Sequence, residues 1–191
     1  MMRDFRQDLA RYKAFGESSR RIILNPAVWC IFWYRLGRAI YGGTSWRLLR
    51  LPLKALHVAG SVLVEALLQM RLNVRAKIGP GLLIAHCGGI TLHPDVVIGS
   101  HCDLAHHVTM GTRGLGSAGV PCLGNDVYVG TNAVLIGPIV VGDGARIGAN
   151  SLVNRDVPAN ATVMGVPAEI VQRREAVRSL ARMKDDGEES G

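Results

Sequence analysis

The strongest constraint on this chain is an aliphatic residue that recurs every six positions through its second half. Gly or Ala usually follows it, and a second, usually small, side chain lies two positions before it, as at Ala76, Cys102 and Ala145. Repeats of one short unit build solenoids, in which each unit buries its apolar side against its neighbours. The aliphatic series is Ile78, Ile84, Ile90, Ile98, Leu104, Met110, Leu123, Val129, Leu135, Val141, Ile147 and Val153.

A six-residue period with two inward positions predicts short parallel strands that meet at tight corners. Three hexads close a triangular coil of about 18 residues, and such coils stack about 4.8 Å apart. The residue after each aliphatic is small because the corner leaves no room for a larger side chain. We therefore expect residues 76–170 to form a parallel β-helix.

Two interruptions of the period locate the insertions. The step from Ile90 to Ile98 is eight residues, which leaves two extra residues near His93 and Pro94. The second and longer insertion, 111–122, is rich in glycine. We expect it to leave the coil as an exposed loop, and loops on a rigid scaffold often carry function.

The register of the coils places His86 and His106 at one corner. Each lies two positions after an aliphatic of the series, and the 20 residues between them make one turn plus the two extra residues. Thr131 and Ala149 continue the same corner. A histidine titrates near neutral pH and can serve as a general base. This corner is therefore the candidate active site; the alternative is that both histidines are solvated corner residues.

The other histidines and the cysteines have ordinary explanations. Cys102 takes an inward small position, so packing accounts for it. Cys87 adjoins His86, but we interpret it as a spectator, and the cysteines show no CxxC spacing. We expect free thiols in a reducing cytoplasm. The histidines interpreted as structural or surface residues are His57, His93 and His101, whereas His107 adjoins the corner and is either part of the site or a bystander.

The first 75 residues differ in charge from the rest of the chain. They contain 13 Lys and Arg against 4 Asp and Glu, whereas the whole chain has a net charge of +7. A basic segment that is also aromatic suits an anionic surface. The first residues are too charged for a secretory signal peptide, and no nucleic-acid-binding motif is present. We expect a cytoplasmic protein, or one peripheral on the inner face of the membrane, that binds no nucleic acid.

Segment 1–75 should be helical. Pro26 and Pro52 lie near the starts of two helices expected over 27–41 and 48–70. The longest apolar stretch, 58–68, is too short to span a bilayer. The helices therefore serve to assemble subunits, to lie on a membrane, or both. Trp29, Trp33, Leu36 and Ile40 recur at helical spacing.

Two stretches carry a resemblance to a known family. The segments 78–111 and 139–171, the second with a GVPA signature, resemble the hexapeptide-repeat acyltransferases, and in particular the serine acetyltransferases. The resemblance implies a left-handed β-helix, acetyl-CoA as co-substrate, no metal, and a homotrimer or a multiple of trimers. A short C-terminal helix and an acidic tail are expected over 171–191.

The resemblance also suggests roles for individual residues. His86 falls on the catalytic histidine of the family, and we expect His106 to be a second or cooperating base. The residues that fall where the family holds coenzyme A are Gly111, Thr112, Thr131 and Ala149. A backbone N–H at the start of the loop would stabilise the oxyanion.

Three departures from the family concern the acceptor. Ala85 replaces an acidic residue that helps to hold serine, and Val120 replaces a loop histidine. The segment 71–73 stands where the family has the aspartate that orients its catalytic histidine. These departures weaken the expectation that serine is the acceptor.

A second branch, the acetyltransferases of exopolysaccharide and colanic-acid biosynthesis, resembles the chain in Tyr34–Arg35, in His106 and in the turn Thr112–Gly114. We therefore expect a sugar hydroxyl, free or lipid-linked, as the acceptor, with serine as the alternative. A zinc enzyme of the γ-carbonic anhydrase type, using His101 and His106, is a remote alternative, and a non-catalytic scaffold is another.

Overall fold

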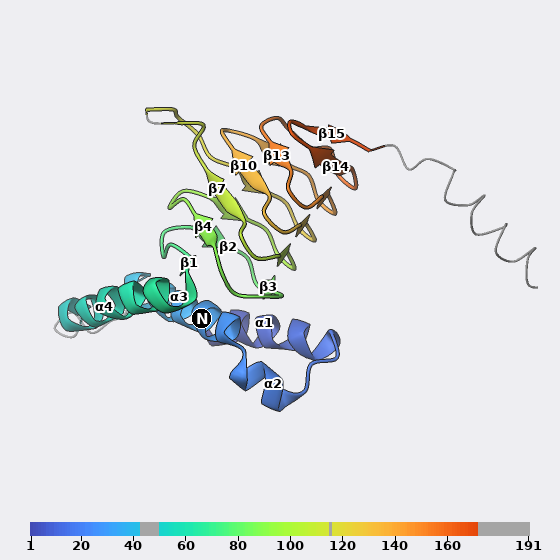
Figure 1. Ribbon diagram of the computed structural model, residues 1–191. Coiled ribbons are helices and arrows are strands. Elements are labelled where there is room, and N and C mark those ends of the chain that lie inside the picture. Colours follow the sequence, from blue (N-terminus) through green and yellow to red (C-terminus); the bar gives the residue numbers. More distant parts are fainter. Residues whose placement is uncertain (43–49, 115, 172–191) are drawn as a thin grey trace, which may run out of the picture.

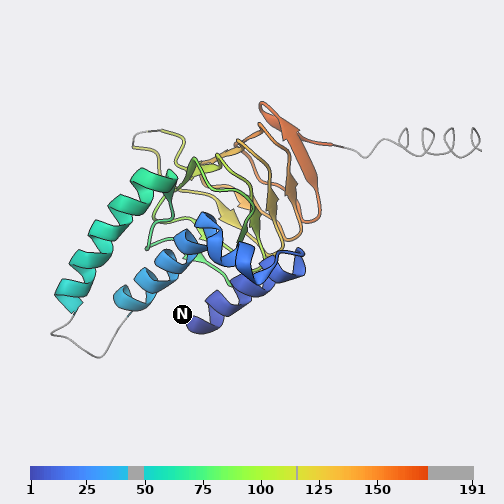
Figure 2. The ribbon, with the colours of Figure 1, turned by 60° about the horizontal axis from the view of Figure 1, so that its bottom comes forward.

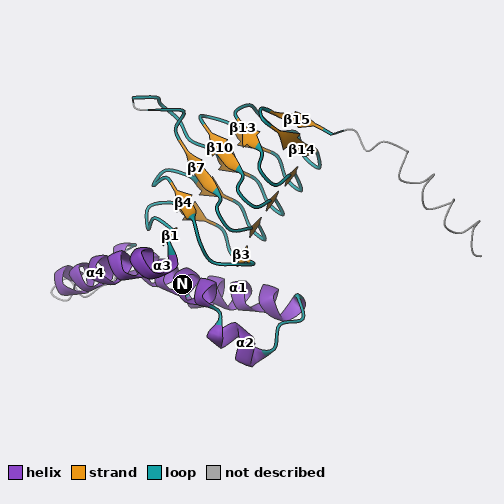
Figure 3. Ribbon diagram, in the orientation of Figure 1, coloured by secondary structure: helices purple, strands orange, loops and turns teal. Residues whose placement is uncertain are grey.

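The computed structural model describes residues 1–42, 50–114 and 116–171, with helices at one end and a three-sided prism of strands above them (Figures 1 and 3). The C-terminal helix and acidic tail expected over 171–191 lie outside these residues, apart from Val171. The helices are α1 (Met2–Ala14), α2 (Ser19–Leu24), α3 (Pro26–Tyr41) and α4 (Arg50–Leu68).

The strands form three sheets, each a stack of strands from successive coils. Sheet A contains β1 (Met70–Arg71), β4 (Ile90–Leu92), β7 (Thr109–Gly111), β10 (Val134–Ile136) and β13 (Leu152–Val153). Sheet B contains β2 (Lys77–Ile78), β5 (Val97–Ile98), β8 (Cys122–Leu123) and β11 (Val140–Val141). Sheet C contains β3 (Leu83–Ile84), β6 (Asp103–Leu104), β9 (Tyr128–Val129), β12 (Arg146–Ile147), β14 (Thr162–Gly165) and the antiparallel β15 (Ala168–Ile170).

The six-residue period corresponds to the packing of the prism. Every aliphatic residue of the series is buried, and Ile78, at 7% exposure, is the most open of them. The small residues two positions before them are buried as well. The close approach at the corners is confirmed, because a Cβ atom on Gly99 would lie 2.3 Å from the carbonyl oxygen of Gly124 in the next coil. The prediction of stacked parallel coils is therefore confirmed.

A second corner rule was not read from the sequence. The residue three positions after an aliphatic of the series turns the chain with a positive φ, as at Asp126, Asn132 and Asn150, where φ is 56°, 59° and 57°. Asn and Asp tolerate this left-handed conformation better than most residues do. His101 and His107, with φ of 58° and 59°, occupy the same position in their coils. Their place in the sequence is thus explained by the turn.

The first coil of the prism is capped by tyrosines from the helices. The Tyr12 hydroxyl donates to the carbonyl oxygen of Ile84 at 2.9 Å and accepts from the N–H of Ile84 at 3.1 Å. The Tyr34 hydroxyl likewise donates to Ala76 at 2.7 Å and accepts from Ile78 at 3.2 Å. An outermost coil has no strand beneath it, so these side chains replace the missing strand.

A buried ion pair completes this cap. Both nitrogens of Arg35 that face Asp8 donate to its carboxylate, at 2.9 and 3.0 Å. Arg35 also donates to the carbonyl oxygens of Ile78 and Gly79, and Asp8 accepts from the N–H of Leu82. The pair therefore fastens α1 and α3 to the first coil.

The helices α3 and α4 pack side by side (Figure 2). Their starts, Pro26 and Arg50, lie close to the expected positions, whereas α1 and α2 were not anticipated. The tryptophan stripe is not the core of α3, since Trp29 is 55% exposed. Trp33 instead donates its indole N–H to Ser61 of α4 at 3.0 Å.

We predict that Asp8→Ala destabilises the fold by about 3–5 kcal/mol, because it leaves the Arg35 charge buried and unpaired. Arg75→Ala is the matched control: it removes the Arg75–Asp95 ion pair, in which the arginine side chain is 71% exposed. Exposed pairs contribute less than about 1 kcal/mol. Chemical denaturation at a fixed protein concentration measures the free energy of unfolding of both variants. Equal losses would contradict the role of the Asp8–Arg35 pair in fastening the helices to the first coil.

Candidate active site

The predicted corner exists, and it joins sheet C to sheet A. Strand pairing aligns Ile84 with Leu104 and then Val129 with Ile147, so the residues two positions later stack on successive coils. The residues stacked there are His86, His106, Thr131 and Ala149. The rings of His86 and His106 meet edge to face, with their centroids 5.9 Å apart. Their catalytic roles stay predictions.

The two histidines differ in their surroundings. His86 is exposed, whereas His106 is half-buried and lies edge to face with His107 at 5.3 Å. The Nδ1 atom of His106 is buried and makes no hydrogen bond. A buried, unpaired nitrogen is costly, and such atoms are concentrated where a site has a chemical task. His86, being exposed, is the more accessible of the two side chains.

Two other histidines, His101 and His107, pack over glycines of the preceding coil. The ring of His107 covers Gly89, where a Cβ atom would lie 2.1 Å from its Nδ1 atom, and His101 covers Gly81 in the same way. His101 is at the corner between sheets B and C, and His106 is at the opposite end of β6. Five residues of extended chain separate them by roughly 15 Å. Within one chain, His101 and His106 are therefore too far apart to bind the same metal ion.

The cysteines divide into two buried and two exposed residues. Burial raises the pKa of the Cys30 thiol to about 12, and burial raises the pKa of Cys102 to about 11. Neither forms a thiolate near neutral pH, so neither is a nucleophile. Cys87 and Cys122 are exposed.

Gly111 and Thr112 lie at the other end of β7 from the histidines. Gly111 pairs with Ile136 in sheet A, and the chain then leaves the prism as a loop that projects past β7 (Figure 1). About five residues of extended chain, roughly 15 Å, separate Gly111 from His106. The coenzyme A positions inferred from the family thus fall at two different corners of one chain.

The first residues of the loop contact the corner from which the loop leaves the prism. The guanidinium of Arg113 donates to the carbonyl oxygen of Asn154, and it covers Gly137 on the way. The hydroxyl of Thr112 donates to Gly114 at 3.2 Å. Arg113 was not singled out in the sequence, although a basic side chain at the root of a loop suits an anionic substrate.

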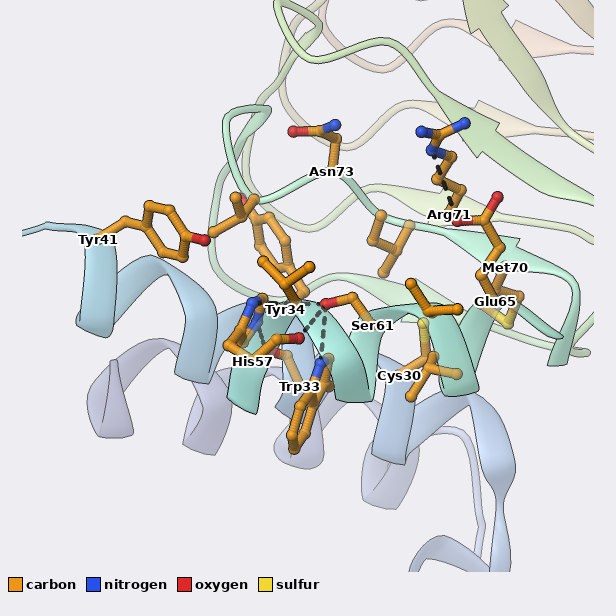
Figure 4. Close-up of a pocket in the computed structure, with 15 residues that line it drawn as sticks. Cys30, Trp33, Tyr34, Tyr41, His57, Ser61, Glu65, Met70, Arg71 and Asn73 are labelled. Carbon is orange, nitrogen blue, oxygen red and sulfur yellow. Dashed lines mark hydrogen bonds and ion pairs between the residues drawn. The ribbon is translucent and has the colours of Figure 1, made fainter. Parts of the chain in front are cut away.

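A separate cavity of about 310 Å³ lies between α3, α4 and β1 (Figure 4). His57 stacks on the indole of Trp33 with ring centroids 5.3 Å apart, and its Nε2 atom lies 3.2 Å from the Trp33 carbonyl oxygen. Ser61 accepts from the indole N–H of Trp33 in α3 and donates to the carbonyl oxygen of His57 in α4. These contacts join the helices, so we interpret His57 as a packing residue. An ion pair between Arg71 and Glu65 closes the rim.

Comparison with known proteins identifies the repeat. The family model described as bacterial transferase hexapeptide (six repeats) matches residues 123–155. The serine acetyltransferase of Helicobacter pylori strain J99 is 33% identical over 153 residues, which are 80% of this chain and 85% of the relative. That of Synechococcus elongatus is 30% identical over 171 residues, 89% of this chain and 67% of the relative.

Solved structures agree with this result. The crystal structure of Neisseria gonorrhoeae serine acetyltransferase superimposes with a TM-score of 0.77 at 29% identity, covering 90% of this chain. The soybean apoenzyme gives a TM-score of 0.74 at 30% identity over 86% of this chain. The match spans 66% of the length of either structure. This likeness implies that the β-helix is left-handed.

The stacked coils and the histidine corner define a hexapeptide-repeat acyltransferase. The chain belongs to the serine acetyltransferase family and is thus an O-acetyltransferase. One expectation needs correction. We placed the chain nearest to the exopolysaccharide enzymes, but these relatives are all named serine acetyltransferases, so that finer placement is not supported.

Proposed function

We propose that this chain transfers the acetyl group of acetyl-CoA to the hydroxyl of a small acceptor, with serine as the first acceptor to test. The observation that carries the proposal is the exposed His86, in edge-to-face contact with His106 at 5.9 Å and beside a corner that continues in small residues. Names of relatives support serine, because each of them is a serine acetyltransferase.

His86 acts as the general base in this proposal. Its neutral imidazole removes the hydroxyl proton as the acceptor oxygen attacks the thioester carbonyl carbon. The tetrahedral intermediate then expels the coenzyme A thiolate, and the imidazolium returns the proton to that sulfur. In this proposal transfer is direct, without an acyl-enzyme, and the buried thiols of Cys30 and Cys102, whose pKa values are raised, take no part as nucleophiles. A backbone N–H near Gly111 stabilises the oxyanion.

The site is completed across a subunit interface. Within one chain the histidine corner and the start of the loop are roughly 15 Å apart. In a cyclic trimer the edge of sheet A that bears His86 meets the opposite edge of a neighbouring chain, where Gly111 and Thr112 begin the loop. We therefore propose a homotrimer, or a multiple of it, with three shared sites.

A sugar hydroxyl is the second candidate acceptor. The observation that favours it is the exposed Ala85 beside His86, where the family has a carboxylate that helps to hold serine. Arg71, near the position of the orienting aspartate of the family, pairs with Glu65 at 3.6 Å instead. A neutral corner offers no partner to the ammonium group of serine and suits an uncharged acceptor.

The rate at which acetyl-CoA releases its thiol, measured with each candidate acceptor, shows which acceptor the enzyme uses. We expect serine to raise the rate of thiol release at least about tenfold over the rate without acceptor, because a bound hydroxyl replaces water as the nucleophile. A neutral hexose and its nucleotide conjugate form the second arm. If the sugars raise the rate of thiol release and serine does not, a sugar hydroxyl is the acceptor and serine is excluded. Absence of coenzyme A binding would contradict the acyltransferase proposal itself.

Substitution of Ala85 sharpens this assay. Ala85→Asp should lower the KM for serine by roughly tenfold, since a carboxylate near His86 can pair with the ammonium group. Ala85→Asn is the matched control of equal size without the charge. Equal KM values for the two variants would remove Ala85 as the cause of weak serine use.

We predict that His86→Ala lowers kcat at least about 10²-fold while the Kd for coenzyme A stays near the wild-type value, because only the proton transfer is lost. Steady-state kinetics and calorimetry measure the two quantities. The same substitution at His106 is the comparison, and a loss at His106 with none at His86 would reverse the assignment.

Mixed trimers test the shared site. His86→Ala and Gly111→Trp chains, carrying different tags and co-expressed, are each expected to be inactive alone. Every trimer purified through both tags then contains one interface of three with an intact histidine and an intact loop, so we expect about a third of the wild-type rate. Inactive mixed trimers, or a monomer of 20.6 kDa by light scattering, would contradict the shared site.

A further inference from the structure

Among the described residues, one helix is long and apolar enough to cross a membrane by length and composition alone. It is α4, over the window Leu51–Leu68, of which only 6% is buried in the structure. The longest apolar stretch expected from the sequence, 58–68, is only part of this helix. The apolar window begins at Leu51, so it is longer than expected.

Side chains divide α4 into two faces of different chemistry. The inner face packs on α3 and contains Lys54, His57, Gly60, Ser61, Val64 and Leu68, all buried or half-buried. We call the exposed remainder the outer face, and its apolar members are Leu51, Pro52, Leu53, Ala55, Leu56, Val58, Ala59, Val62, Leu63, Ala66 and Leu67.

The outer face is wide as well as apolar. At about 100° per residue, the positions from Val58 round to Leu67 cover an unbroken arc of about 180°. Among the α4 residues whose exposure is described, Glu65 is the only charged one on the exposed side, and it lies at the edge of the arc and pairs with Arg71. One neighbouring helix covers an apolar stripe of roughly 100°. A single packed helix would therefore leave much of this arc in water.

Charge indicates what covers this face. Of the acidic residues in segment 1–75, Asp8 is buried against Arg35, Asp4 and Glu17 are half-buried, and Glu65 is exposed. The helical end therefore presents mainly cations to its surroundings, which suits anionic lipid headgroups. The exposed basic residues of α1, α2 and α3 are Arg3, Arg6, Lys13, Arg20, Arg21 and Arg38.

We propose that the outer face of α4 lies in the interface of an anionic bilayer, with the helix axis along the membrane surface. The helix lies on the bilayer because it is held along its length. Trp33 donates to Ser61, and His57 contacts the Trp33 carbonyl oxygen. The helix α3 is in turn bonded to the first coil. Insertion across the bilayer would break these contacts, whereas an in-plane helix keeps them.

Of Trp29 and Trp33, only Trp29 is exposed enough to contact lipid. Trp33 is half-buried between α3 and α4 and is unavailable to the membrane. Trp29 is 55% exposed beside Ile23 and Leu24, which are 61% and 72% exposed. A membrane position also brings the histidine corner close to an acceptor carried on a lipid, which fits the second candidate acceptor.

Flotation of the full-length protein with vesicles tests this proposal. The probes are phosphatidylcholine vesicles with and without about 30% phosphatidylglycerol, at low and high salt. We expect flotation with the anionic vesicles at low salt, and at least about tenfold less bound protein in high salt or without the anionic lipid. Failure to float with anionic vesicles at low salt would overturn the proposal.

Two matched double variants distinguish vesicle binding through the outer face from nonspecific binding through any exposed apolar residue. Leu56→Gln with Leu63→Gln changes outer-face residues that are 65% and 58% exposed. Val166→Gln with Ile170→Gln changes residues that are 72% and 58% exposed at the far end of the prism (Figure 1). We expect the first pair to lower vesicle binding at least about tenfold, and the second to leave it unchanged.

Light scattering of the same variants distinguishes lipid from a second copy of the chain. An unchanged mass in the Leu56→Gln, Leu63→Gln variant together with lost flotation supports the membrane. A smaller oligomer together with unchanged flotation would show that the outer face joins subunits, and would overturn the proposal. Because no step measures acetyl transfer, the result does not depend on the proposed function.

Discussion

The fold depends on how the first coil of the prism satisfies its backbone. A stacked coil bonds to the coils on either side, but the outermost one has N–H and C=O groups with no strand to meet them. Here the helices supply the partners, because Tyr12 and Tyr34 each bond to both the N–H and the C=O side of that edge. A β-helix without these helices would present an open edge, which is a template for aggregation.

The buried pair of Asp8 and Arg35 gives this cap its specificity. An isolated buried charge is costly, so each residue is acceptable only while the other is in place. The remaining donors and acceptors of the pair bond to Leu82, Ile78 and Gly79 in the first coil. The correct docking of α1 and α3 is therefore the one arrangement in which every member of the network is satisfied.

The position of the site follows from this rigid stack. His86 and His106 approach each other because two consecutive coils are held in register by the pairing of Ile84 with Leu104. No long-range loop is needed to bring them together. The loop over 111–122 instead reaches away from its own histidines, and this is why the proposed site requires a second chain. The proposed trimer thus rests on the distance between the histidine corner and the start of the loop within one chain.

Much of the prism was predictable from the sequence because its period of six is carried by consecutive residues. The inward series, the extra residues near His93 and the histidine corner all follow from counting along the chain. Asn132 and Asn150 have left-handed backbone conformations. The recurrence of Asn or Asp at this position of the repeat is visible in the sequence, but it was not part of our prediction. Arg35 entered the sequence analysis only through the Tyr34–Arg35 resemblance, and its burial depends on the distant Asp8. Pairing of this kind leaves no local trace in the sequence.

One turn of α3 contacts both α4 and the first coil of the prism. Trp33 points to α4, whereas the next two residues, Tyr34 and Arg35, bond to the first coil. These consecutive side chains point in different directions because a helix advances about 100° per residue. The first coil ends in β3, and the turn after β3 carries His86. The outer face of α4 and the histidine corner are therefore joined by a short series of packed, hydrogen-bonded residues. An enzyme resting on a bilayer through α4 would hold its histidine corner at a distance from the lipid that these contacts set.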